Sequence, residues 1–162
     1  MGGYPYFPIF FYLSEKHVVV IGAGRIAARR VCTLIHFTPR ITVVASKIHP
    51  DIEELEHMGK VTVLRKNFEY SDLQESDLVL AATDDRALNA RIGAQCGERG
   101  VFVNVSSDRS LCDFCFPGVV RQGNVVIGVT ASGTDHRKAR AVTDQIKRCL
   151  ADCRLSEGCD GI

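Results

Sequence analysis

The chain has 162 residues, of which 46% are hydrophobic and 24% charged, a composition typical of one soluble globular domain with a small appendage. Lysine and arginine number 20 against 19 aspartates and glutamates, which argues against a nucleic-acid partner or a membrane anchor. The seven cysteines are an odd, scattered set, and the apolar N-terminus has no basic start. We therefore expect reduced thiols and a cytoplasmic protein.

The first part of the chain alternates apolar runs of strand length with helix-forming segments. Helices are expected from Arg25 until before Pro39, from Pro50 to Gly59, and after Asp84, which is a suitable N-cap for a helix that ends before Gly100. Strands are expected at residues 17–21, 41–45, 61–64, 77–82 and 101–105. Uniformly apolar strands that alternate with helices predict an α/β fold with a Rossmann-type, doubly wound parallel sheet over residues 1–116.

The pattern changes after residue 116. Residues 119–121 and 125–129 flank a turn that contains Gly123, and they predict a β-hairpin. A helix is expected from about Asp135, with apolar residues at helical spacing: Ala139, Val142, Ile146 and Cys149. We predict a small hairpin-and-helix module over residues 117–153, followed by a flexible tail over residues 154–162.

The run Gly22-Ala23-Gly24-Arg25-Ile26-Ala27 matches G-x-G-x-x-A between the first strand and the first helix. Gly22 permits the tight turn, Gly24 lets the backbone approach a diphosphate, and Ala27 lets the helix pack closely on the sheet. The start of the helix, at Arg25 and Ile26, supplies N–H groups and the positive end of the dipole. The run therefore predicts a dinucleotide site.

The acidic residue that usually binds the adenosine ribose is missing, because the second strand is followed by Ser46 and Lys47. Ser46 could hydrogen-bond a ribose hydroxyl, whereas Lys47 and Arg25 could equally attract a 2′-phosphate. These residues leave the choice between NAD and NADP open.

Two further polar groups belong to the ends of strands. Thr83 and Asp84 follow the fourth strand, while Asn104 lies in the fifth strand and Ser107 and Asp108 follow it. Ligands of open α/β sheets lie outside the carboxyl ends of the strands, so we expect both groups to face the same crevice as the glycine turn.

These segments, in this order, resemble the precorrin-2 dehydrogenase family, the N-terminal type of siroheme synthase, over roughly residues 7–150. The family includes bifunctional members that also insert iron. The resemblance rests on the glycine turn with Arg29-Arg30 and on Phe7-Pro8-Ile9-Phe10, Val43-Val44-Ala45, Ala81-Ala82-Thr83-Asp84-Asp85, Leu88-Asn89, Asn104-Val105, Cys112-Asp113-Phe114 and Phe116-Pro117.

The resemblance implies NAD-dependent dehydrogenation of precorrin-2 to sirohydrochlorin by a homodimer whose hairpin-and-helix module makes the subunit contacts. The candidate cofactor contacts are the glycine turn, Ser46, Lys47, Thr83 and Asp84, and relatives continue into further helices where this chain stops soon after Leu150. A substrate with several carboxylates would be clamped by basic side chains, for which the candidates are Arg109, Arg121, Arg137, Lys138 and Arg140.

The sequence departs from the family at the catalytic position, where two consecutive aspartates are usual and Ser107-Asp108 stands here. Either Asp108 serves as the base or the reaction relies on cofactor positioning, and we favour Asp108, with Asn104 and Ser107 orienting substrate or nicotinamide. A second departure is Asp135-His136 in place of Ser-Pro, which keeps a helix cap.

Two alternatives remain open. The chain could be a dinucleotide- or tetrapyrrole-binding module that has lost turnover, or a bifunctional enzyme in which His136 and Asp108 assist iron insertion. The pairs Cys112/Cys115 and Cys149/Cys153 lack the further ligands of a zinc set, so no metal site is predicted.

Overall fold

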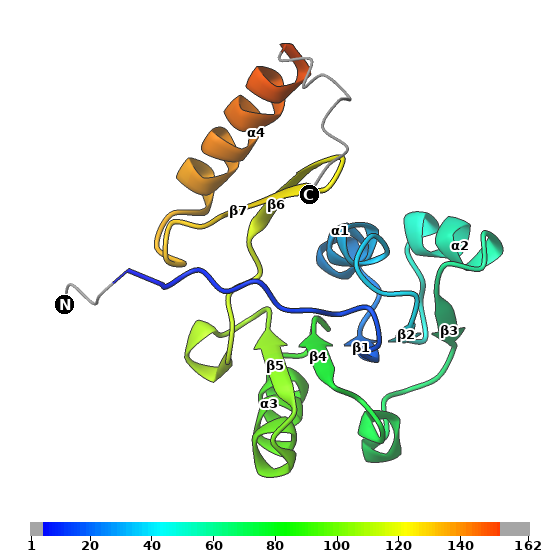
Figure 1. Ribbon diagram of the computed structural model, residues 1–162. Coiled ribbons are helices and arrows are strands. Elements are labelled where there is room, and N and C mark those ends of the chain that lie inside the picture. Colours follow the sequence, from blue (N-terminus) through cyan, green and yellow to red (C-terminus); the bar gives the residue numbers. More distant parts are fainter. Residues whose placement is uncertain (1–4, 153–162) are drawn as a thin grey trace. The chain divides into compact units, whose positions relative to one another are not determined.

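The computed structural model describes residues 5–152, so the tail predicted over residues 154–162 lies outside the described residues. Contacts divide the chain into two compact units (Figure 1). We call Phe10–Cys115 the sheet unit, and Met1–Ile9 together with Phe116–Ile162 the hairpin unit. A separate function for each unit stays a prediction.

Five parallel strands form the sheet, in the order β3-β2-β1-β4-β5. The register pairs Ile21 with both Val44 and Ala81, and Ala81 with Val105, so four strands end side by side at one edge. The chain runs outward from β1 in one direction and returns through β4 in the other, which is a topological switch point. The predicted doubly wound α/β fold is confirmed. The strands are β1 (Val18–Ile21), β2 (Ile41–Val44), β3 (Thr62–Leu64), β4 (Leu78–Ala81) and β5 (Phe102–Val105).

Helices cover both faces of this sheet (Figure 1). Helices α1 (Arg25–Leu34) and α2 (Pro50–His57) lie on one face, and α3 (Arg86–Arg99) lies on the other. Because both faces are covered, β1 and β4 are buried at every position, as their unbroken apolar runs predict. The α3 face packs Ile92 and Cys96 against the strands, and burial raises the pKa of the Cys96 thiol to about 11.

Two short 3-10 helices were not predicted, since three or four residues are too few to show a hydrophobic period. They are η1 (Tyr70–Leu73), before β4, and η2 (Arg109–Leu111), after β5. The second one matters for the site, because it fixes the conformation of the loop that carries Asp108.

The hairpin unit contains the predicted hairpin, β6 (Gly118–Gln122) with β7 (Val125–Val129), and the helix α4 (His136–Asp152). Asp135 caps α4, because its Oδ1 accepts the N–H of Lys138 at 2.9 Å. Figure 1 shows α4 lying along the hairpin.

The face of α4 that packs on the hairpin is shifted from the spacing noted in the sequence. Thr143 is buried, with 6% of its surface exposed, whereas Val142 is 39% exposed and Cys149 is also exposed. Gly118 of β6 explains the shift, since a Cβ there would overlap the Thr143 hydroxyl. The missing side chain lets the helix approach the strand through Thr143.

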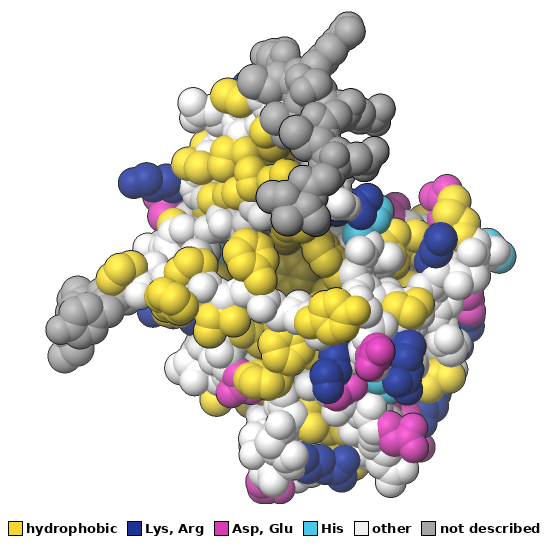
Figure 2. Space-filling view, viewed as in Figure 1, with side chains coloured by type: hydrophobic (Ala, Val, Ile, Leu, Met, Phe, Trp, Pro, Cys, Tyr) yellow, Lys and Arg dark blue, Asp and Glu magenta, His cyan; other side chains and the backbone are white. Residues whose placement is uncertain are grey.

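The N-terminal stretch exposes apolar side chains, which gather visibly in Figure 2. Phe7 is 85% exposed, and Ile9 and Phe10 are exposed as well. Within the hairpin unit, the backbone N–H of Tyr6 donates to Ser132 Oγ at 3.1 Å.

Candidate functional site

The glycine turn lies where β1 ends, at the edge at which the four strands finish together. Gly22 has a φ of +99°, and its N–H donates to the carbonyl of Val44 at 2.9 Å. A Cβ at Gly22 would stand 2.5 Å from the carbonyl oxygen of Ala82 and 2.8 Å from the backbone nitrogen of Thr83. Only glycine fits both this conformation and this contact, so the turn after β1 touches the peptide that follows β4.

Gly24 is the N-cap of α1, and a Cβ there would meet nothing within 4 Å. No side chain caps this helix start and no acidic residue occupies its first turn. Arg25 and Ile26 are exposed, while Ala27 is fully buried against the sheet. The start of α1 therefore offers N–H groups, a positive dipole end and open backbone, which together fit the diphosphate of a dinucleotide.

Ser46 and Lys47 are both exposed in the loop that follows β2. This loop also contains His49, which sequence analysis did not single out. The N–H of His49 donates to the carbonyl of Ala23 at 3.0 Å, and its ring nitrogen Nδ1 accepts the N–H of Asp51 at 3.3 Å. His49 thus joins the ribose-side loop to the glycine turn and caps α2.

The loop after β4 corrects one prediction. Asp85, and not Asp84, is the N-cap of α3, because its Oδ1 accepts the N–H groups of Ala87 and Leu88 at 2.8 and 3.0 Å. The helix begins one residue later than expected because Thr83 Oγ1 accepts the N–H of Asp85 at 3.2 Å and fixes that residue in an extended conformation. The Asp84 side chain is exposed and does not cap the helix, so it is accessible to a ligand.

Asn89 of α3 is a residue that sequence analysis named only as part of a motif. Its Oδ1 accepts the N–H of Thr83 at 3.1 Å, and its Nδ2 donates to the Thr83 carbonyl at 2.9 Å and to Ser107 Oγ at 3.3 Å. The structure therefore brings Gly22, Thr83 and Ser107 together, as the placement of the strand ends predicts.

Asn104 lies within β5 and is 5% exposed. Its Nδ2 donates to the carbonyl of Phe114 at 2.7 Å, whereas its Oδ1 has no hydrogen-bond partner among the described residues. A buried acceptor without a donor costs free energy unless a ligand or water supplies one. Asn104 Oδ1 is enclosed as well as unpaired, so a ligand N–H group would reach it only after a small movement of the surrounding residues.

Asp108 is exposed and is held by its own loop. Its Oδ1 accepts from the N–H of Ser110 at 2.9 Å and from Ser110 Oγ at 2.7 Å, and these bonds hold the pKa of the carboxyl below its ordinary value. Among the described residues, no group donates to its Oδ2. Asp108 is therefore an ionised carboxylate at neutral pH with one oxygen open to a proton donor.

The basic residues named as substrate clamps fall into different units. Arg109 belongs to the sheet unit as the first residue of η2. The remaining four belong to the hairpin unit, and they are Arg121, Arg137, Lys138 and Arg140.

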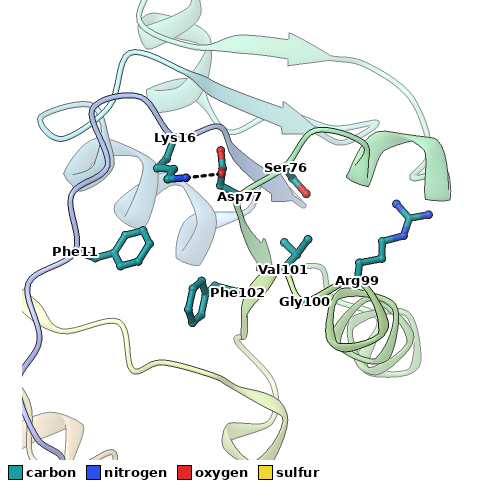
Figure 3. Close-up of a pocket in the computed structure, with 8 residues that line it drawn as sticks. All are labelled: Phe11, Lys16, Ser76, Asp77, Arg99, Gly100, Val101 and Phe102. Carbon is teal, nitrogen blue, oxygen red and sulfur yellow. Dashed lines mark hydrogen bonds and ion pairs between the residues drawn. The ribbon is translucent and has the colours of Figure 1, made fainter.

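A cavity of about 350 Å³ lies at the other edge of the sheet, where the strands begin. Figure 3 shows the rings of Phe11 and Phe102 on one side of it and Arg99 on the other. Lys16 Nζ lies 2.9 Å from Asp77 Oδ1 in its wall. This cavity is at the opposite end of the strands from the glycine turn, and we assign no part of the dinucleotide site to it.

Within residues 5–152 no helix is long and apolar enough to cross a membrane. Over the same residues, no group of three or more histidine, cysteine or acidic side chains is placed to hold a metal ion.

Residues 9–118 match the protein family described as "Putative NAD(P)-binding". The chain belongs to this family. The match covers the glycine turn and all five strands of the sheet, so the predicted cofactor class, a nicotinamide dinucleotide, is confirmed at the level of the family.

Among curated proteins, the chain is 35% identical over 145 residues to siroheme synthase 1 of Cronobacter sakazakii, which covers 90% of this chain and 31% of that protein. It is 37% identical over 145 residues to siroheme synthase of Actinobacillus pleuropneumoniae, with 90% and 30% covered. The chain thus spans about a third of the length of these relatives. The resemblance to siroheme synthases predicted from the motifs is confirmed.

Among solved structures, the fold is similar to that of SirC, precorrin-2 dehydrogenase, with a TM-score of 0.78 and 23% identity over 89% of this chain and 70% of that one. At this identity the likeness supports the fold, including the hairpin and the helix that follow the sheet.

Proposed function

We propose that this chain is a precorrin-2 dehydrogenase, which removes two hydrogens from precorrin-2 to give sirohydrochlorin with NAD as the acceptor. The observation that supports it most is the uncapped start of α1 beside an open Gly24, in a chain that is 35% identical to a siroheme synthase. The proposal concerns this chain, which spans about a third of the length of such relatives.

The division of labour follows from the site. Bound NAD supplies a hydride acceptor, so one hydrogen leaves precorrin-2 as hydride and the other as a proton. The N–H groups at the start of α1 and the Arg25 guanidinium bind the diphosphate. Ser46 binds a hydroxyl of the adenosine ribose, and Lys47 in the same loop is the cation that a 2′-phosphate would meet. The half-buried Thr83 and the exposed Asp84 border the nicotinamide side.

Asp108 is the residue that we propose to accept the proton, through its Oδ2. Its lowered pKa keeps it ionised, so it is ready to accept at neutral pH, although the same shift makes it a weak base. Asn104 Oδ1 accepts an N–H of the nicotinamide amide or of a pyrrole. The Ser107 hydroxyl, which accepts a hydrogen bond from Asn89, orients the substrate or the nicotinamide. These three residues follow or belong to β5, so the strand and the loop after it place them.

We also propose that Arg109 binds a carboxylate of the substrate and that the protein is a cytoplasmic homodimer. The exposed Val142 and Cys149 support the dimer, because they give α4 a second apolar face beyond the one that packs on its own hairpin. Removal of that face, as in Val142→Glu, should convert dimers to monomers in size-exclusion chromatography.

The central test mixes the purified chain with precorrin-2 and NAD without oxygen and follows the absorbance of NADH. We expect catalytic NADH formation, its loss in Asp108→Ala, and NADH affinity within about twofold of the wild type in that variant. Glu98→Ala, which removes an exposed carboxylate near the far end of α3, is the matched control and should retain full rate.

Two outcomes would change the assignment. Full turnover by Asp108→Ala would remove this carboxylate from the mechanism. Tight binding of NADH without any turnover by the wild type would favour a binding module that has lost catalysis.

A further inference from the structure

Asn89 is a fully buried polar residue, with 0% of its surface exposed, one turn into α3. Its side-chain amide satisfies all four of its hydrogen-bonding positions. Oδ1 accepts from Thr83 N at 3.1 Å and from Thr83 Oγ1 at 2.7 Å, while Nδ2 donates to Thr83 O at 2.9 Å and to Ser107 Oγ at 3.3 Å. No donor or acceptor of this amide is left for a ligand, so any role of Asn89 acts through its two partners.

The first partner, Thr83, leads to the glycine turn. The Ala82–Thr83 peptide that donates to Asn89 is the same peptide that a Cβ at Gly22 would overlap. Asn89 therefore holds, through hydrogen bonds, the same peptide that Gly22 contacts. A backbone hydrogen bond from Ala82 N to the carbonyl of Ile21, at 2.8 Å, also joins the peptide after β4 to the end of β1.

The second partner, Ser107, belongs to the loop after β5. One amide thus joins the ends of β4 and β5, and through Gly22 it also reaches the end of β1. These strand ends lie on either side of the switch point.

We propose that Asn89 is a positioning residue that fixes the β4 loop against the glycine turn and Ser107 beside it, and so sets the dinucleotide affinity of the sheet unit. This inference rests on the proposed function, because it takes the glycine turn as the dinucleotide site. Loss of the amide leaves the N–H and the carbonyl of Thr83 unsatisfied, and the loop must move to reach water. Sub-ångström shifts of this kind weaken a site whose groups are prearranged.

The test compares Asn89 with a buried polar residue at the opposite edge of the sheet. Thr38 is also buried, and its hydroxyl donates to the carbonyl of Lys16 at 2.9 Å and accepts the N–H of Arg40 at 3.0 Å. Asn89→Ala and Thr38→Val each remove a buried polar link between two loops. Thermal unfolding of the full chain measures stability, and fluorescence titration with NADH measures affinity.

We expect both variants to unfold at lower temperature, but only Asn89→Ala to bind NADH about tenfold more weakly. Thr38→Val should bind NADH within about twofold of the wild type. Ser107→Ala removes a single bond of Asn89 and should weaken NADH binding by about twofold to threefold. The double variant should bind no more weakly than Asn89→Ala alone, because the two residues act through one link.

An NADH affinity of Asn89→Ala within about twofold of the wild type would show that the residue is only structural and would overturn the inference. If that variant does not fold, an unchanged affinity of Ser107→Ala overturns the proposed link instead. A wild-type chain that binds no NADH would overturn the proposed function and this inference together. If the wild type binds NADH and the variants bind it equally well, only this inference fails.

Discussion

The two edges of the sheet are both polar, but they satisfy their polar groups differently. At the edge where the strands begin, Asp77 accepts Lys16 Nζ at 2.9 Å and the N–H of His17 at 2.8 Å, and these bonds lower the pKa of its carboxyl. At the edge where the strands end, the start of α1 lacks a side-chain cap, and Asn104 Oδ1 has no partner within the described part of the chain.

The difference between the two edges indicates which polar residues are functional candidates. Polar groups that pair with each other stabilise the fold and leave nothing for a ligand. Donors and acceptors that the fold leaves unpaired, at a switch point, are the ones a ligand can complete. By this criterion the cavity at the beginning of the strands is the weaker candidate, because the polar groups in its wall pair with each other.

The largest expected effect tests the glycine turn, at the edge where the strands end. Gly22→Ala forces a left-handed φ of +99° on alanine and places its Cβ 2.5 Å from the Ala82 oxygen. We expect a loss of at least about 2 kcal/mol in the free energy of unfolding, measured by urea denaturation. A variant as stable as the wild type would mean that the turn and the β4 peptide can separate freely.

Gly24→Ala sharpens the comparison, because it changes binding far more than it changes the fold. Its Cβ would meet nothing within 4 Å and its φ is −79°, so the loss of stability should stay within about 1 kcal/mol, the cost of a poorer N-cap. The methyl group would occupy the space of the diphosphate and should weaken NADH binding by about tenfold or more, measured by fluorescence titration. Unchanged affinity would place the dinucleotide elsewhere.

A smaller effect is expected at Lys47, and it tests the choice between NAD and NADP. Lys47→Ala removes an exposed cation from the ribose-side loop. We expect NADPH affinity to fall by about threefold to tenfold and NADH affinity to change by less than about twofold, measured by calorimetry at low salt. Equal losses for both ligands would assign Lys47 to the diphosphate.

The smallest effect concerns the edge where the strands begin. A folded-state pKa below the unfolded value means that Asp77 stabilises the fold above the unfolded pKa of about 4 and loses this contribution as the pH falls through the folded pKa. Because the Lys16–Asp77 pair is partly exposed, Asp77→Asn should cost less than about 1 kcal/mol at pH 7. Urea denaturation should show the wild type and the variant converging in acid, and NADH affinity should stay unchanged. A weaker NADH affinity would show that both edges contribute to the site.

The sheet could be predicted from the sequence because each strand is a short, mostly apolar run between turn residues. The glycine turn could be predicted as well, since its three small residues have distinct steric reasons. Hydrophobic period also located α4, but not the face that packs, because that choice depends on Gly118 of a distant strand.

The roles of Asn89, Asp85 and Ser110 could not be predicted, because each depends on which backbone group lies within hydrogen-bond distance. Asp84 and Asp85 are equally good N-cap residues in the sequence. The hydrogen bond from Asp85 N to Thr83 Oγ1 holds Asp85 in the extended conformation that the N-cap of α3 requires. Likewise, nothing in the sequence indicates that Ser110 holds Asp108.

The contact between Gly22 and the Ala82–Thr83 peptide has a thermodynamic consequence. Folding already fixes that turn between two strands, so the dinucleotide site is preorganised. Binding therefore orders little backbone and costs little conformational entropy. Association should then be quick, and differences in affinity among variants of the turn should appear mainly as faster release.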